Sequence, residues 1–195
     1  MKINISDVKK LRQQTNAPMM DAKKALEESK GDFDKAVEWL RKKGADMVAK
    51  KAGREAKEGI VESYVHSNKK IGVLVELGCE TDFVAKNEEF VALAHEIAMQ
   101  VAASDPKYIN PTDVPEEELA NEKKVIMEMF AKEKKPQDVI EKIAEGKLEK
   151  IRNDLSLAKQ SLVKNPDITI EELIAEKTVK LSEKIEIRKF VRYEI

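Results

Sequence analysis

The sequence predicts an α+β fold in which an N-terminal three-helix module precedes a small antiparallel sheet, packed with helices and carrying a protruding helical hairpin. Residues 6–44 contain three short helical patterns separated by turn residues, which predicts the module. Two β-like runs flanking a polar turn predict the first strands of the sheet. A charged helical stretch over about 116–153, divided by Pro136, predicts the helical hairpin. We therefore expect a module with its linker over residues 1–55 and a core domain over residues 56–195.

Each helix of the module has its own start or stop signal. Ser6 is a suitable N-cap for the first helix, because its hydroxyl can accept from a free N–H of the first turn. Pro18 suits the first position of the second helix, where its missing N–H leaves no hydrogen bond unmade. Asp32 is the expected cap of the third helix, which we expect Gly44 to end.

Two adjacent methionines in the second helix are candidate contact residues. Met19 and Met20 cannot both face the same core, so at least one of them is expected to point outward. Methionine adapts to irregular surfaces, which suits a partner contact. The alternative is that both are ordinary helix-packing methionines.

The core domain is expected to combine a β-hairpin, a long helix and a C-terminal strand. The hairpin strands are residues 59–66 and 70–77, and a third β-like run covers about 185–194. The helix over residues 87–103 carries an apolar stripe at helical spacing, so it is expected to cover the sheet. The stripe consists of Phe90, Leu93, Ala94, Ile97, Ala98 and Val101.

The helical hairpin is expected from two apolar stripes on densely charged segments. Narrow apolar seams between Lys- and Glu-rich faces favour an antiparallel pair that protrudes into solvent or meets a partner. The first stripe is Leu119, Val125, Ile126, Met129 and Phe130, and the second is Val139, Ile140, Ile143, Leu148 and Ile151.

Composition excludes several classes of protein. Cys79 is the only cysteine, so no intrachain disulfide can form, and a reducing, cytoplasmic setting is expected. A net charge of -1 without a dense basic stripe among aromatic residues argues against direct nucleic-acid binding. No run of 18 apolar residues and no leader-like pattern is present, which argues against a membrane partner.

Signatures of enzymatic chemistry are absent from the sequence. It contains no phosphate-binding glycine loop, no nucleophile with an adjacent base and no ligand spacing typical of a metal site, so neither catalytic residues nor cofactors nor metals are expected. Cys79, Glu80 and Asp82 are a weak set of mixed ligands. An enzyme that uses Glu80, Asp82 and a histidine stays as a remote alternative.

The most informative segment is the acidic turn at residues 79–86, between an apolar strand and a long helix. Thr81 and Asp82 can satisfy the free backbone donors of such a turn and thereby hold the next side chain at a fixed angle. Phe83 is then the group presented to a partner. The alternative is that Phe83 folds back onto the sheet.

Four blocks of the chain together resemble the elongation factor Ts family, the exchange factors for elongation factor Tu. The blocks are residues 11–26 (LRQQTNAPMMDAKKAL), 81–87 (TDFVAKN), 135–148 and 190–194 (FVRYE). The chain is similar to the short form of the family, which has a single core module, so a homodimer could supply a missing half. Asn16 and Pro18 depart from the pattern, since they stand where the family usually has glycines.

The resemblance implies a function without covalent chemistry. The protein would bind GDP-loaded elongation factor Tu, disturb its magnesium site and promote GDP release until GTP binds. By position, Asp82 and Phe83 would enter beside the magnesium ion, framed by Thr81 and Val84. A second contact through the N-terminal module would involve Leu11, Arg12, Met19 and Met20. The rival interpretation is a protein-binding adaptor without exchange activity, because a three-helix module of this size is similar to ubiquitin-associated (UBA) domains.

Overall fold

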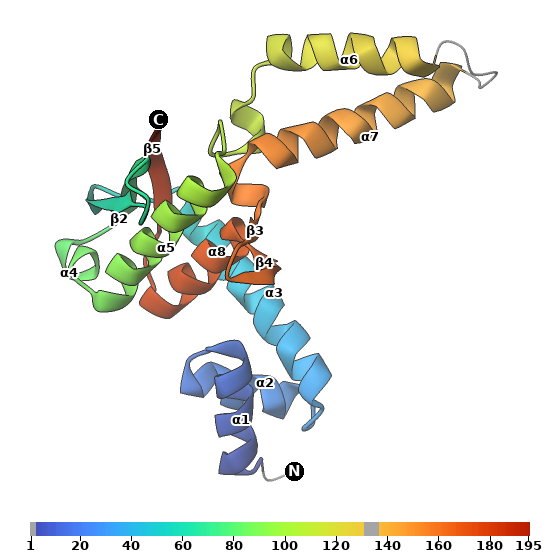
Figure 1. Ribbon diagram of the computed structural model, residues 1–195. Helices are drawn as coiled ribbons and strands as arrows, with labels where there is room; N and C mark the ends of the chain where they lie inside the picture. The colour runs from blue at the N-terminus through green and yellow to red at the C-terminus, as the bar shows by residue number, and fades with distance from the viewer. Residues whose placement is uncertain (1–2, 131–136) are drawn as a thin grey trace. The chain divides into compact units, whose positions relative to one another are not determined.

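The computed structural model describes residues 3–130 and 137–195 and confirms the α+β fold (Figure 1). Pro136, the residue expected to divide the helical hairpin, lies outside the described residues. The helices are α1 (Ile5–Thr15), α2 (Met19–Glu28), α3 (Phe33–Ala52), α4 (Asp82–Ala85), α5 (Glu88–Ser104), α6 (Glu116–Phe130), α7 (Gln137–Leu155) and α8 (Ile170–Leu181). The strands are β1 (Glu58–Val65), β2 (Ile71–Cys79), β3 (Ser161–Leu162), β4 (Asn165–Thr169) and β5 (Glu186–Glu194).

The described residues pack into two compact units, each assembled from separate stretches of the chain. Unit 1 takes its residues from 1–62, 75–95 and 172–188, and unit 2 takes its residues from 63–74, 96–171 and 189–195. Unit 1 contains the three N-terminal helices, and unit 2 contains the α6–α7 hairpin. A boundary near residue 55 between separately folding domains stays a prediction.

The three N-terminal helices form around one apolar core, but two of the helices start differently from expectation. Asn4, and not Ser6, caps α1, since its side chain accepts from the Ser6 N–H at 3.1 Å. Pro18 is the N-cap of α2, one residue before the expected position, whereas Asp32 caps α3 as expected. The core of the three helices contains Val8, Leu11, Ala22, Ala25, Leu26 and Ala36.

The third helix does not end at Gly44, as the sequence suggested, but continues to Ala52. A glycine inside a helix costs only about 1 kcal/mol relative to alanine, and good helix formers follow it. The packing does not demand glycine at this position, because a Cβ atom there would make an ordinary van der Waals contact of 3.5 Å with Cγ2 of Val179 on α8. The extra turns carry Lys51 to the α8–β5 connection, where its Nζ donates to the Ser182 carbonyl at 2.5 Å.

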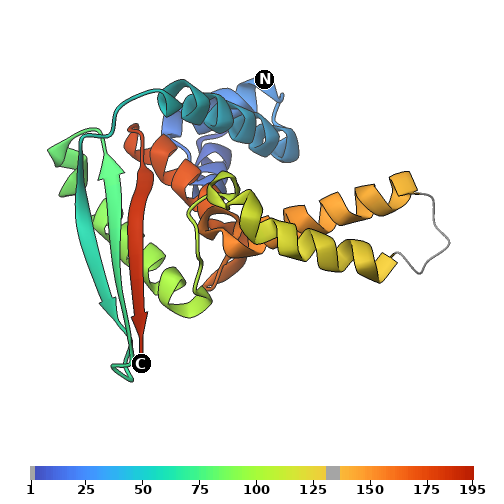
Figure 2. The same ribbon diagram turned by 90° about the horizontal axis from the view of Figure 1, so that it is seen from above.

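Strands β1, β2 and β5 form a three-stranded sheet with the order β1-β2-β5 (Figure 2). The His66 N–H donates to the Ile71 carbonyl at 2.9 Å and closes the β1–β2 hairpin. The Ile195 N–H donates to the Lys70 carbonyl at 3.0 Å, so β5 runs antiparallel along the other side of β2. The expected β-hairpin and C-terminal strand are therefore confirmed.

The expected apolar stripe of α5 is also confirmed. Phe90, Leu93, Ala94, Ile97, Ala98 and Val101 are each at most 1 % exposed. The helix starts after Asn87, whose Oδ1 accepts from the Glu89 N–H at 2.8 Å. Val73, Val75 and Leu77 of β2 are buried as well.

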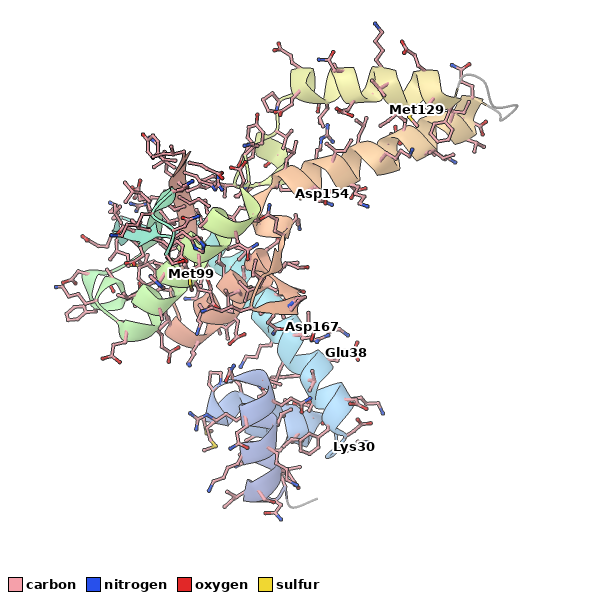
Figure 3. All side chains as sticks on the ribbon, in the orientation of Figure 1. Lys30, Glu38, Met99, Met129, Asp154 and Asp167 are labelled. Atoms are coloured by element: carbon pink, nitrogen blue, oxygen red, sulfur yellow. The ribbon has the colours of Figure 1, made fainter. Side chains whose placement is uncertain are left out.

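The helical hairpin is confirmed as α6 and α7, which run side by side (Figures 1 and 2). Its seam differs from expectation, because Val125 and Met129 are exposed while Met127 packs on the core. Val139 also remains on the surface. The buried seam contains Val114, Leu119, Ile126, Ala144 and Leu148. Figure 3 shows Met129 near the far end of α6 and Asp154 near the end of α7.

Sequence analysis did not anticipate the segment that returns from the hairpin to β5. It contains the short antiparallel pair β3–β4 and the helix α8, whose buried residues include Ile170, Leu173 and Thr178. Ser182, at φ 56°, ends α8 and turns the chain toward β5. Among the described residues, no helix combines the length and apolar character needed to cross a membrane.

Candidate functional site

The turn between β2 and α5 contains α4 (Figure 1), and Phe83 of this short helix is exposed to solvent. Its side chain is 83 % exposed, whereas its neighbour Ala85 is only 7 % exposed. The alternative in which Phe83 folds back onto the sheet is therefore wrong. An aromatic ring held in water on a rigid scaffold loses no protein contacts when a partner buries it, and this geometry suits a binding tip.

A single closed turn of helix holds the ring. Thr81 begins α4 as its N-cap, and its Oγ1 accepts from the Val84 N–H at 3.4 Å. The Thr81 carbonyl accepts from the Ala85 N–H at 3.1 Å, and the Asp82 carbonyl accepts from the Lys86 N–H at 3.2 Å. The structure thus brings Thr81, Asp82, Phe83 and Val84 together on four residues of ordered backbone.

Asp82 keeps its charge at the exposed face of this turn. Its Oδ2 accepts from Lys86 Nζ at 2.8 Å, an i,i+4 ion pair. This hydrogen bond and the charge of Lys86 hold the pKa of Asp82 below its ordinary value of 3.8. The tip therefore presents a carboxylate beside an aromatic ring at neutral pH. A carboxylate is the kind of group that interacts with, or competes for, a divalent cation.

Two glutamates anchor the start of the turn, and sequence reasoning identified neither role. Glu183, in the α8–β5 connection, accepts from the backbone N–H groups of Glu80 and Thr81, both at 3.0 Å. It also accepts from the Thr81 hydroxyl at 2.6 Å. In return, the Glu80 carboxylate accepts from the Lys184 N–H at 2.6 Å and from Arg54 Nη1 at 3.1 Å. We call these two carboxylates and their partners the corner latch.

The corner latch gives a testable dependence of stability on pH. The hydrogen bond from the Lys184 N–H, followed by that from Arg54, holds the pKa of Glu80 below its ordinary value of 4.5. A depressed folded-state pKa stabilises the fold above the unfolded value, and the contribution is lost as pH falls through the folded value. We expect Glu80→Gln to be less stable than the parent at neutral pH, with a difference that shrinks below about pH 4.

Urea unfolding followed by circular dichroism at several pH values measures this difference. Glu122→Gln, on an exposed middle turn of α6, is the matched control and should show no such dependence. A difference between Glu80→Gln and the parent that stays constant from neutral to acid pH would contradict the electrostatic origin.

Cys79 lies in the core at the end of β2. It is fully buried, and its thiol donates to the Thr81 carbonyl at 3.2 Å. Burial, followed by the charge of Glu183, raises the pKa of Cys79 above its ordinary value of 9.0. Within residues 3–130 and 137–195, no group of three or more His, Cys, Asp or Glu side chains is arranged to hold a metal ion.

Burial and the raised pKa should make this thiol inert in the folded protein, because the thiolate is the reactive form. We expect a thiol reagent at mildly alkaline pH to leave Cys79 unlabelled in the native protein and to label it fully in urea. Mass spectrometry gives the labelled fraction in both states. Rapid labelling of folded protein would show that the β2–α4 junction opens readily.

The N-terminal module presents a second candidate surface, built from α1 and α2. Met19 is 43 % exposed and Met20 is 72 % exposed, so both methionines reach solvent, as at least one was expected to do. Arg12 is exposed as well, and it lines a surface hollow of about 360 Å³ with Met19. Leu11 is fully buried in the module core, where it supports this surface from beneath.

The structure explains one departure from the family pattern. Asn16 ends α1 with φ 52°, in the left-handed region that glycine adopts freely. Asparagine is among the few other residues that tolerate this conformation. Its side-chain Nδ2 also donates to Glu176 of α8 at 3.0 Å. Asn16 therefore preserves the turn and adds a contact that glycine cannot make.

Comparisons with known proteins show the family to which the chain belongs. A family model described as "Elongation factor TS" matches residues 4–195. The chain is 52 % identical to elongation factor Ts of Carboxydothermus hydrogenoformans, over 96 % of this chain and 87 % of that protein. It is 53 % identical to elongation factor Ts of Moorella thermoacetica, over 99 % of this chain and 95 % of that protein. It is also 52 % identical to that of Thermodesulfovibrio yellowstonii, over 100 % and 97 %. The chain therefore belongs to the elongation factor Ts family of translation elongation factors.

Proposed function

We propose that this protein is the guanine-nucleotide exchange factor for elongation factor Tu in its cell. It binds the GDP complex, disturbs the magnesium site, promotes GDP release and leaves when GTP binds. No covalent bond is made or broken in this cycle, so the protein is an exchange factor and not an enzyme. A translation factor of this kind acts in the cytoplasm.

The observation that carries the proposal is the exposed ring of Phe83 on an anchored turn. Burial of one Phe side chain is worth about 1.5–3 kcal/mol, which corresponds to one to two decades in affinity. GDP and the exchange factor are two coupled ligands of elongation factor Tu. The factor therefore weakens GDP binding by the same ratio by which GDP weakens binding of the factor. One ring therefore supplies a substantial part of the required coupling.

Asp82 supplies the other part. Mg²⁺ neutralises nucleotide phosphates, and its displacement weakens nucleotide binding through the loss of a divalent charge. Asp82 stays ionised beside Phe83, so its carboxylate enters the magnesium site with the ring. Thr81 and Val84 frame this tip through the helical hydrogen bonds of α4.

The N-terminal surface of Arg12, Met19 and Met20 serves a different purpose in this proposal. It binds a second face of the same domain of elongation factor Tu and holds the factor in place. Leu11 shapes it from the core. Affinity then depends on this surface, whereas the rate of GDP release depends on the Phe83 tip.

We expect a homodimer in addition, because one face of the sheet in unit 2 exposes apolar side chains to solvent. The His66–Ile71 hydrogen bond places Val65 opposite Gly72, so Val65 and Leu74 share a face. They are 65 % and 46 % exposed. Light scattering should give twice the chain mass of 22.1 kDa, and Leu74→Glu should shift the mass toward the monomer. A parent protein that is monomeric at all accessible concentrations would contradict the dimer.

Equilibrium binding distinguishes exchange from the adaptor alternative. The affinity of this protein for elongation factor Tu is measured by calorimetry with the nucleotide-free protein and with its GDP complex. An exchange factor must bind the nucleotide-free form more tightly, by the reciprocity of linkage. An adaptor that uses only Met19 and Met20 would bind both forms equally, which would contradict the proposal.

A further inference from the structure

The connection between α8 and β5, residues 182–185, holds the turn that carries Phe83, although the two segments are about 100 residues apart in the sequence. Glu183 accepts three hydrogen bonds from the two residues that precede α4, two from backbone N–H groups and one from the Thr81 hydroxyl. Glu80, one of these two residues, accepts in turn from the Lys184 N–H. Each of the two segments therefore supplies a carboxylate that accepts from backbone N–H groups of the other segment. Such hydrogen bonds to a charged acceptor are about twice as strong as neutral ones.

The α8–β5 connection is itself fixed by α3 and the linker that follows. Lys51 is only 8 % exposed, and its Nζ donates to the Ser182 carbonyl at 2.5 Å. Lys184 Nζ donates to the Arg54 carbonyl at 2.9 Å. Ser182 adopts φ 56°, a conformation that a serine keeps only where its surroundings determine it. Glu183 therefore sits on a corner that is constrained on both sides.

The helix that carries Phe83 cannot hold its own position. α4 has four residues, and a helix of one turn is unstable in water, because nucleation fixes several residues for a single hydrogen bond. The ring itself is exposed and therefore does not hold α4 in place. The direction of Phe83 thus depends on how the preceding backbone of Glu80 and Thr81 is held.

We propose that Glu183 is a positioning residue for nucleotide exchange, which fixes the turn so that Phe83 points outward before the partner arrives. This inference rests on the proposed exchange function and goes beyond it by assigning a role outside the exposed tip. A tip ordered in advance loses less conformational entropy on binding, so more of the burial energy of Phe83 is available for expelling GDP.

The test is a double-mutant cycle of Glu183→Ala and Phe83→Ala. GDP release from elongation factor Tu is measured over a range of concentrations of this protein and its variants. We expect Glu183→Ala, which removes all three hydrogen bonds, to lower the saturating release rate at least about tenfold, the factor for loss of a single hydrogen bond to a charged group. The half-saturating concentration should change little, since the N-terminal surface is intact. Glu183→Gln keeps an oxygen that can accept from both N–H groups, so it should restore most of the rate.

The double variant separates positioning from general stability. If Glu183 acts through the ring, its replacement in the Phe83→Ala background should change the rate by less than about twofold. Amide exchange in the free protein should show that the Glu80 and Thr81 N–H groups lose protection in Glu183→Ala. Glu171→Ala, which removes a carboxylate from the first turn of α8, is the control for both measurements.

Each outcome decides the inference. If Phe83→Ala slows release and Glu183→Ala does not, the positioning role is wrong and the proposed function stands. If the two effects multiply in the double variant, Glu183 does not act through the ring and the inference is also wrong. A parent protein that fails to accelerate release overturns the proposed function and the inference together. Should Glu183→Ala unfold in the assay, Glu183→Asp, which is one methylene shorter, takes its place in the cycle.

Discussion

Phe83→Ala should slow GDP release from elongation factor Tu by one to two decades at saturating factor, because it removes a ring whose burial is worth about 1.5–3 kcal/mol. The variant should fold like the parent, since the ring is 83 % exposed in the free protein. Much of the affinity should remain, because the N-terminal surface is untouched. Stopped-flow release of a fluorescent GDP analogue measures the rate, and thermal unfolding measures the stability.

Val125→Ala is the matched control for Phe83→Ala. It also removes an exposed apolar side chain, 51 % exposed on α6, so it tests whether any such loss slows exchange. Phe83→Leu should retain part of the rate through its remaining apolar area. A release rate for Phe83→Ala equal to that of the parent would show that the ring does not promote GDP release.

Replacing both Met19 and Met20 by alanine should affect binding and leave the saturating rate of release unchanged. Loss of two adaptable apolar contacts should raise the dissociation rate of the complex about tenfold or more, since interface changes act mainly on dissociation. The concentration needed for half-maximal release should rise by a similar factor. Surface plasmon resonance with immobilised elongation factor Tu gives the dissociation rate directly.

The control for the methionine pair is Met129→Ala on the hairpin, where the same side chain is 63 % exposed (Figure 3). It should dissociate like the parent. A deletion of the whole module is a poorer test, because residues 1–55 include Lys51 and Arg54, which hold the corner latch. An unchanged dissociation rate for Met19→Ala/Met20→Ala would remove the N-terminal surface from the interface.

The sequence predicted elements that have a clear period and local punctuation. The α5 stripe from Phe90 to Val101 and the hairpin around residues 67–69 follow from side-chain spacing alone. Gly44 was misleading, because a glycine that ends a helix and one that lies inside a helix look alike in sequence. In α6, the apolar residues Val125 and Met129 were assigned to a seam that Met127 occupies instead.

The tip was also predictable, but its support was not. Phe83 stands out as an aromatic residue in an acidic turn between two apolar elements. Glu183 is one of many glutamates in a highly charged chain, and its partners are backbone N–H groups 102 and 103 residues away. A hydrogen bond to a backbone N–H does not require a particular residue type as the partner. No local pattern marks Glu183, and only the folded chain brings it to Thr81.

The most direct test of the account is the release rate of a fluorescent GDP analogue from elongation factor Tu, measured by stopped flow at increasing concentrations of this protein. We expect an acceleration that saturates, with a plateau set by the Phe83 tip and a half-saturating concentration set by the N-terminal surface. A release rate that stays at its intrinsic value at every concentration, with a partner known to bind and release nucleotide, would contradict it.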